Sequence, residues 1–244
     1  MRKLLVYILT VLLTVGCEVI DRNERFIPVD EHTGTRRHVL FDFTGFRCVN
    51  CPSAAEIAQE ITDTYNGQIY VVSLHPASNP FTQGAYDYTC PAADSVYRWM
   101  GGNASTPFPA GNIDMQTFEG NWFADMSTWA TMAYRAISDS VSPTPGMEVN
   151  IAYWLVEDSV PGVQAMPDGS VNTHYYHRHV LRATWPENPF GVRTPFTGNE
   201  PLRVPDIPEG CDRDKLSVLT LIFEPNTYHL LDAYETTTDF RIYP

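Results

Sequence analysis

Basic residues are scarce in this sequence. It has 16 Lys and Arg against 29 Asp and Glu, which gives a formal net charge of -13 over 244 residues. A chain this acidic repels nucleic acid and anionic lipid surfaces, and no cluster of Lys or Arg offsets the charge. We therefore expect no nucleic-acid partner.

Long apolar runs are also absent, apart from one near the start. The run Leu4–Val15 follows Arg2 and Lys3 and ends in the tetrapeptide TVGC, whose last residue is Cys17. It is too short to span a bilayer but has the length of the apolar part of an export signal. The TVGC end resembles a lipobox, so we predict a lipoprotein signal over residues 1–17 and a lipid anchor on Cys17. The alternative is an ordinary cleaved secretory signal.

Cysteine is rare, with five residues in the chain. If Cys17 carries the lipid, four remain, and an exported protein meets an oxidising compartment in which thiols pair. Cys48 and Cys51 form a CxxC and most simply pair with each other, which leaves Cys90 and Cys211 for one long-range bridge. Four cysteines allow three connectivities, and the sequence does not choose among them. Because a second CxxC is missing, a structural zinc site is disfavoured, and we predict no metal and no other cofactor.

The first half of the chain has the pattern of a mixed α/β domain over residues 36–141, after a polar tether at 18–35. The apolar run at 38–44 predicts a buried strand, the helical spacing at 52–65 a helix, and the run at 68–74 a second strand. This order is a βαβ unit with parallel strands. An insertion rich in Pro, Gly and Asn follows at 75–106. The remaining predicted elements of this half are a helix near 94–100, a strand at 112–118 and a helix at 122–137.

The spacing of apolar residues changes after the Pro- and Gly-containing segment SPTPG, which ends at Gly146. Short apolar runs separated by turn signals predict strands at 147–157, 179–185, 216–223 and 228–234. Several short strands of this kind favour a β-sandwich, here over residues 142–244. The predicted fold class is therefore an α/β domain followed by an all-β sandwich domain.

The CxxC is the candidate chemical site, because it lies where the first strand turns into the first helix. Unpaired backbone N–H groups and the positive end of the helix dipole favour the thiolate of Cys48 there. Arg47 adds a neighbouring positive charge, and Cys51 is spaced to resolve a mixed disulfide. The alternative is a structural disulfide that never reacts.

The segment VLFDFTGFRCVNC, residues 39–51, resembles the thioredoxin signature, including an acidic residue six positions before the first cysteine. The resemblance implies that Asp42 relays a proton to or from Cys51; the alternative is a capping carboxylate. It also implies a cis-proline facing the CxxC, for which Pro109 is the matching position and Pro107 the second choice. The sequence departs from enzymatic thioredoxins at Arg47, where an aromatic residue is usual.

A wider set of segments is similar to the Omp28-related outer membrane lipoproteins of the Bacteroidetes. It comprises DFTGFRCVNCPSAA, PAGNID, HVLR and the closing hairpin. The resemblance implies a thioredoxin-like domain, a β-domain and an outer-membrane location, and does not settle the activity.

Two functions follow as hypotheses. In the first, the protein is a lipid-anchored thiol-disulfide oxidoreductase, with exported cysteine-containing proteins or a membrane electron donor as partners. In the second, it is a non-enzymatic surface lipoprotein, an adhesin or binding module with an inert disulfide. The histidines His174, His177 and His179 suggest a metal site, but a solvated strand face is the preferred interpretation, and for His75 we prefer a loop role over catalysis.

Overall fold

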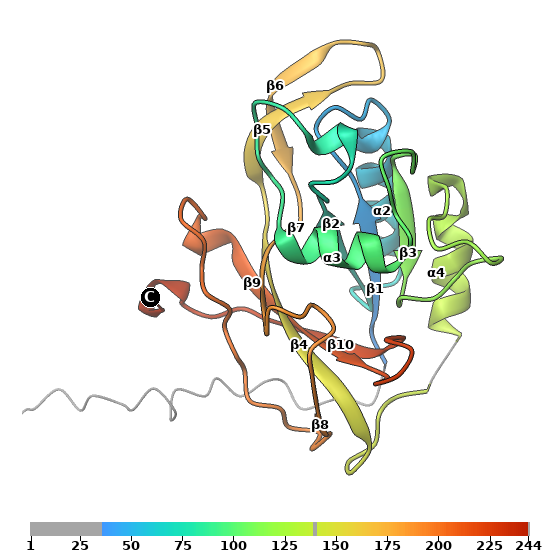
Figure 1. The fold of residues 1–244 in the computed structure, drawn as a ribbon, viewed down its shortest axis with the longest axis vertical. Coiled ribbons are helices and arrows are strands. Elements are labelled where there is room, and N and C mark those ends of the chain that lie inside the picture. Colours follow the sequence, from blue (N-terminus) through green and yellow to red (C-terminus); the bar gives the residue numbers. More distant parts are fainter. Residues whose placement is uncertain (1–35, 139–140, 244) are drawn as a thin grey trace, which may run out of the picture.

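The computed structural model describes residues 36–138 and 141–243. The predicted signal, Cys17 and the tether lie outside these ranges. One curved sheet of eight strands runs through the described chain, with seven of them in the order β10-β9-β4-β7-β2-β1-β3 (Figure 1). The protein is thus a mixed α/β structure, rich in sheet and with few helices.

A βαβ unit begins the fold, as its apolar pattern predicts. Strand β1 (His38–Phe43) pairs in parallel with β2 (Ile69–Leu74), and α2 (Cys51–Thr64) connects them. All six residues of β1 are buried, because the strand is covered on both faces. Helix α2 has a proline in its first turn and ends before Asn66 and Gly67, which both adopt positive φ.

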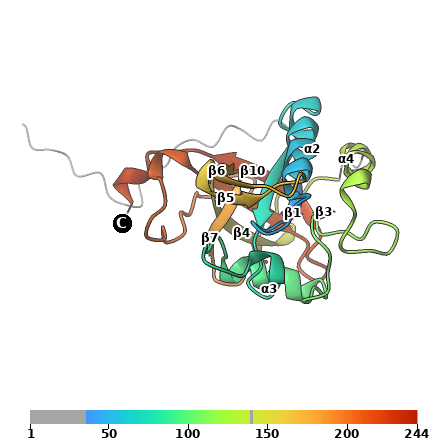
Figure 2. The same ribbon diagram turned by 90° about the horizontal axis from the view of Figure 1, so that it is seen from above.

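Helices cover the two faces of this part of the sheet unequally. Figure 2 shows α2 and α4 (Trp129–Ile137) on one face and α3 (Pro91–Trp99) on the other. Leu40 of β1 packs with the helices α2 and α4, whereas Phe41 and Phe43 pack in the cluster that contains α3. Alternation along the strand therefore places Asp42 on the α2 face.

Two elements of the first half differ from their predicted bounds. Strand β3 (Ala110–Ile113) pairs antiparallel with β1 and stops where Asp114 and Met115 adopt positive φ, so the predicted strand at 112–118 is displaced. The predicted helix at 122–137 starts late, at η3 (Met126–Thr128) and then α4. The carbonyl of Trp122 accepts a hydrogen bond from Asn112, which ties this residue to β3 instead.

The second half of the chain extends the same sheet, so the predicted β-sandwich is wrong. Strand β7 pairs in parallel with β2 through Val180 and Ser73, and the amide of Ser73 donates to the carbonyl of His179 at 2.8 Å. This edge of β2 would otherwise expose unpaired backbone groups. The strands concerned are β4 (Glu148–Glu157), β7 (Val180–Trp185), β8 (Val192–Pro195), β9 (Leu216–Phe223) and β10 (Leu230–Thr236).

Strand β4 is long enough to serve two partners on one side. Its first four residues pair with β8 and its last five with β7, while β9 pairs along its other side. Short 3₁₀ helices complete the described elements: η2 (Pro80–Thr82), η4 (Arg213–Lys215) and η5 (Phe240–Ile242). No helix in the described ranges is long and apolar enough to cross a membrane.

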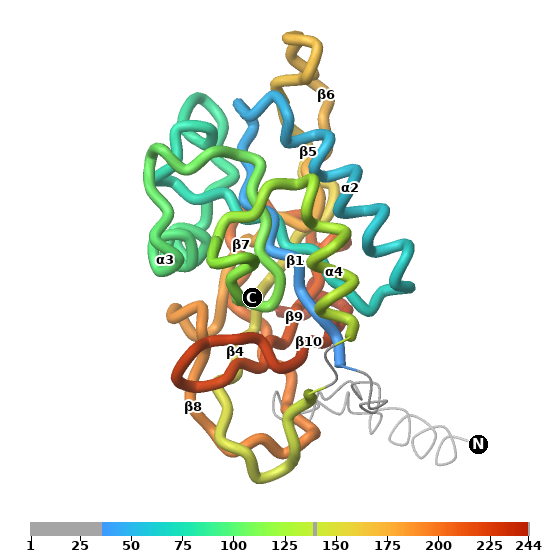
Figure 3. Tube along the Cα trace, turned by 90° about the vertical axis from the view of Figure 1, so that its right-hand side faces the viewer, coloured from blue at the N-terminus to red at the C-terminus, as the bar shows by residue number. Residues whose placement is uncertain are grey.

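A separate hairpin of β5 (Val160–Ala165) and β6 (Val171–His177) forms its own two-stranded sheet, which the sequence pattern did not predict. It projects past the end of the main sheet, beside the turn between β1 and α2 (Figures 1 and 3). The hairpin thus lies at the end of the molecule that carries the CxxC.

Candidate functional site

The pairing of Cys48 with Cys51 is confirmed. Their sulfur atoms form a disulfide with a Cα–Cα separation of 5.4 Å. Cys51 is the first residue of α2, and its amide donates to the carbonyl of Cys48. The disulfide therefore occupies the N-terminal turn of a helix, where unpaired N–H groups favour a thiolate once the bond is reduced.

Asp42 is a buried carboxyl group at the C-terminal end of β1. Its Oδ1 atom has no hydrogen-bond partner among the described residues, and burial raises its pKa from 3.8 to about 7. Removal of water disfavours the charged form, and no nearby cation compensates. Asp42 can therefore hold or release a proton near neutral pH, at the same end of β1 as the loop to Cys48.

Pro109 has the cis peptide bond expected of it, after Phe108, whereas Pro107 has none. It directly precedes β3, and Ala110 pairs with Phe43, the last residue of β1. This register places Pro109 at the edge of the sheet from which the CxxC loop leaves.

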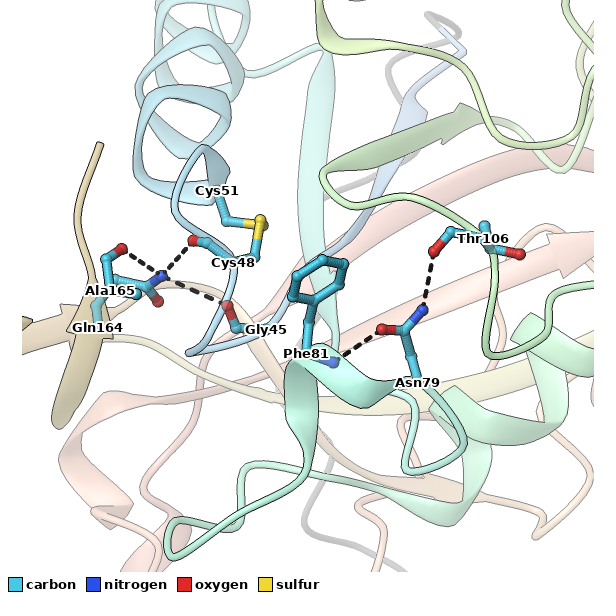
Figure 4. Close-up of a disulfide and its surroundings, with 8 residues drawn as sticks. All are labelled: Gly45, Cys48, Cys51, Asn79, Phe81, Thr106, Gln164 and Ala165. Carbon is cyan, nitrogen blue, oxygen red and sulfur yellow. Dashed lines mark hydrogen bonds between the residues drawn. A yellow bond between two sulfur atoms is a disulfide. The ribbon is translucent and has the colours of Figure 1, made fainter. Parts of the chain in front are cut away.

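Both cysteines are hidden from solvent, with exposed fractions of 1% for Cys48 and 2% for Cys51. The Phe81 ring of η2 packs against the apolar cluster that contains them and faces the disulfide in Figure 4. The predicted insertion at 75–106 thus covers the CxxC.

The hairpin holds the same loop from the other side. Gln164 of β5 donates from its side-chain nitrogen to the carbonyls of Cys48 at 2.8 Å and Gly45 at 3.4 Å (Figure 4). The amide of Ala165 donates to the carbonyl of Phe46 at 2.8 Å. Sequence reasoning missed Gln164, because a single polar residue in a short strand gives no signal of which carbonyls it will contact.

Two buried histidines meet where the hairpin packs against the end of β2. His75 follows β2, and its ring lies 5.7 Å from that of His177 and 5.8 Å from that of Tyr88. Burial, followed by the charges of His177 and Arg182, lowers the pKa of His75 to about 3. Burial likewise lowers the pKa of His177 to about 4. His75 therefore belongs to a buried cluster with Tyr88 and His177; its position at the carboxyl end of a strand was the available signal.

The preferred interpretation of the three histidines as a solvated strand face is wrong for His177, which is buried, although His174 is exposed. His177 ends β6, whereas His179 lies between strands with a φ of 53°. In the described part of the chain, no group of three or more His, Cys, Asp or Glu side chains is placed to hold a metal ion.

The predicted Cys90–Cys211 bridge is also wrong, since both thiols are free. Cys90 is buried at the start of α3, in the apolar cluster that includes the CxxC. Cys211 packs at the edge of a different cluster and accepts a hydrogen bond from Arg182 at 3.4 Å. The two residues are thus held by separate parts of the core.

Comparison with known proteins identifies a shared fold. No family model matches the chain, and no curated protein matches it. The solved structure of HBP35 of Porphyromonas gingivalis is similar with a TM-score of 0.61 and 12% identity, covering 84% of this chain and 76% of that one. A protein from Agrobacterium tumefaciens has a TM-score of 0.47 and 12% identity, covering 81% and 92%. The first likeness shows that the chain has a fold also found in a protein of the Bacteroidetes.

Proposed function

We propose that the protein is a lipid-anchored envelope protein that exchanges thiols and disulfides with exported proteins through Cys48 and Cys51. The anchor would be the lipid on Cys17, and the region around the CxxC would be a thioredoxin-like domain. The disulfide at a helix N-terminus and the cis-Pro109 beside it support this function.

Asp42 is the observation that carries the proposal. A buried carboxyl whose Oδ1 atom lacks a hydrogen-bond partner is costly to the fold, and a structural disulfide does not require such a group. Buried acids with pKa values moved toward neutrality are typical of sites that transfer protons. The group therefore has a role if the neighbouring cysteines change between thiol and disulfide.

The chemistry follows from the order of the two cysteines. In the reduced protein, the Cys48 thiolate attacks a disulfide of the partner, and a sulfur of the partner leaves as a thiolate. Asp42 accepts the proton of Cys51, whose thiolate then attacks the Cys48 sulfur of the mixed disulfide. The second partner sulfur leaves, so the partner ends as a dithiol and the protein as the disulfide that the structure contains.

The test compares Asp42→Asn with the wild-type protein. Release of the partner from the mixed disulfide should slow by about 10- to 100-fold at pH 7, within the range that positioned acid-base groups contribute. Asp63→Asn, which changes an exposed carboxylate of α2, is the matched control and should have no effect. Equal release rates in all three proteins would contradict the role of Asp42.

The second candidate function is a surface lipoprotein with an inert disulfide. The burial of both cysteines favours it, because a sulfur that partner proteins cannot reach does not exchange. The two functions differ in one property: an inert bridge resists reduction in the folded protein.

We also propose membership of the Omp28-related outer membrane lipoproteins, and hence an outer-membrane location. The resemblance of the CxxC segment and of residues 109–114 supports this assignment. The shared fold with a protein from Porphyromonas gingivalis is consistent with a source among the Bacteroidetes.

A further inference from the structure

Residues 79–84, which we call the cap, lie against the loop that carries Cys48. The amide of Arg47 donates to the carbonyl of Phe81 at 3.1 Å, and the Arg47 side chain donates to the carbonyl of Gln83 at 3.3 Å. The loop therefore uses a backbone N–H next to Cys48 to hold another piece of chain.

Gly45 makes this approach possible. A Cβ atom at this position would lie 2.5 Å from the carbonyl oxygen of Phe81, which is closer than real Cβ contacts. Any larger residue would push the cap away from the loop. Because Gly45 has no side chain, the backbone of the cap can approach the loop closely enough to accept the hydrogen bond from the amide of Arg47.

The Phe81 ring fills the apolar space beside the disulfide. It is partly buried and packs against the cluster that includes both cysteines, and it stacks on Phe108 with 5.9 Å between ring centroids. Phe108 is the residue before cis-Pro109. In Figure 4 the ring, and not the backbone of the cap, points toward the disulfide.

The cap is held in place by the protein itself. Asn79 is fully buried; its side chain accepts from the amide of Phe81 and donates to the Tyr97 hydroxyl and to the Thr106 carbonyl (Figure 4). These hydrogen bonds therefore hold the backbone of the cap in position. The Phe81 ring is only partly buried and is held by packing alone, so it is the part of the cap that a competing apolar side chain would displace.

A partner polypeptide would contact this face as the Phe81 ring does. A large apolar side chain of the polypeptide would stack on Phe108, while the amide of Arg47 keeps its bond to the carbonyl of Phe81. We propose that the Phe81 ring is an internal occupant of a partner-binding face, and that the face selects polypeptides with a large apolar residue beside the reacting cysteine. The partner side chain takes the place of the ring against Phe108. This inference rests on the proposed exchange function and adds to it a class of substrate.

The test uses the otherwise full mature chain with Cys51→Ser, Cys90→Ala and Cys211→Ala, so that the coloured product reports the thiol of Cys48 and not the two other free thiols. Two short peptides carry one cysteine as its mixed disulfide with thionitrobenzoate, next to Phe in one peptide and next to Ala in the other. The Cys48 thiolate attacks the peptide sulfur; the bond to thionitrobenzoate breaks, and the coloured thiolate leaves. Free dithiobis-nitrobenzoate reports the intrinsic reactivity of Cys48.

The Phe peptide should react about 10-fold faster than the Ala peptide, the discrimination typical of an apolar pocket. Phe81→Ala should raise the rates of both peptides by about 10-fold, and Phe108→Ala should remove the preference. Phe81→Leu keeps an apolar side chain at the position, so its reaction rates should lie between those of the protein with Phe81 and those of Phe81→Ala. Phe118→Ala, a half-buried aromatic beside Arg135, is the control and should change nothing.

Equal rates for the two peptides, or no acceleration in Phe81→Ala, would overturn the inference while leaving the exchange function intact. A Cys48 that reacts with neither peptide nor the free reagent, in either Phe81 variant, would overturn both.

Discussion

Asp42 and His75 are buried titratable side chains at the same end of the sheet, and their pKa values move in opposite directions. Burial raises the pKa of Asp42 to about 7 and lowers that of His75 to about 3. In both cases the neutral form is the one that the fold accepts. Each group therefore makes stability depend on pH, in opposite ways.

For Asp42, the folded pKa lies above the unfolded value of 3.8. The contribution of Asp42 to the free energy of unfolding is fully present below about pH 4 and is lost as the pH rises through 7, because the unfolded chain releases the proton at a lower pH than the folded protein does. Asp42→Asn should therefore be more stable than the wild type by on the order of 3–4 kcal/mol at pH 8, and close to it at pH 4. Urea unfolding of the oxidised proteins at both pH values measures the difference. A constant difference would mean that the fold does not raise the pKa of Asp42.

For His75, the folded pKa lies below the unfolded value of 6.5, so stability is lost as the pH falls below 6.5. From pH 7 to pH 4.5, the wild type should lose about 2 kcal/mol more than His75→Gln. His174→Gln, at an exposed position of β6, is the control and should lose as much as the wild type. Identical acid profiles for all three proteins would show that His75 is not held neutral by burial.

The hairpin of β5 and β6 is the element that contacts the CxxC loop most directly after the cap. From the hairpin side, Gln164 adds side-chain hydrogen bonds to the carbonyls of Cys48 and Gly45, which also accept backbone bonds within the loop. The outer face of the hairpin exposes Val171 and Tyr176 to solvent. Little apolar area is therefore buried on that face to stabilise the hairpin. Local opening of this element should therefore need less free energy than global unfolding.

Gln164→Ala should lower the free energy of local opening by about 1–2 kcal/mol, because two side-chain hydrogen bonds to the loop are lost, although each carbonyl keeps its backbone donor. Hydrogen exchange at the amide of Ala165, which donates to Phe46, measures this opening. Gln68→Ala, on the surface turn before β2, is the control and should leave the exchange rate unchanged. An unchanged rate in Gln164→Ala would mean that the backbone pairing alone holds the hairpin.

Elements with a strong apolar period were the predictable ones. β1, α2, β2 and β9 lie within a few residues of their expected bounds, because burial repeats along them. The start of α4 was not predictable, since a side-chain bond from Asn112 withdraws Trp122 from the helix. β6 was missed because only His177, its last residue, is buried, so no apolar alternation marks it.

At the site, Cys48, Cys51 and cis-Pro109 were predictable from short sequence patterns. The residues that cover the CxxC loop, Phe81 and Gln164, could not be predicted. They reach the loop through tertiary packing, which leaves no local pattern in the sequence. Cys90 and Cys211 remain unpaired because they pack in different core clusters, which the sequence does not reveal. Counting cysteines cannot show that.

At the scale of the whole molecule, one sheet joins the two halves of the chain. The Phe41 ring of β1 contacts the Trp154 ring of β4 with 5.5 Å between centroids, and both belong to one apolar cluster. Strand counting could not distinguish this arrangement from two separate sheets, because the pairing of β2 with β7 is a long-range choice of register.

The oxidised protein should therefore unfold in a single cooperative transition, with calorimetric and van't Hoff enthalpies that agree. A fragment of residues 36–141 should fail to fold, since it lacks the strand that pairs with β2. Calorimetry of the mature chain and circular dichroism of the fragment provide the measurements. Two separate thermal transitions, or a folded fragment, would show that the halves are independent domains.

The redox potential of the Cys48–Cys51 pair tests the proposed exchange function most directly. The mature chain would be equilibrated with glutathione buffers of graded potential, and the fraction of free Cys48 determined by alkylation and mass spectrometry. Exchange predicts a potential above roughly -270 mV, in the range of disulfides that react in proteins. A bridge that stays closed below about -300 mV in the folded protein would contradict the function and leave a structural cross-link.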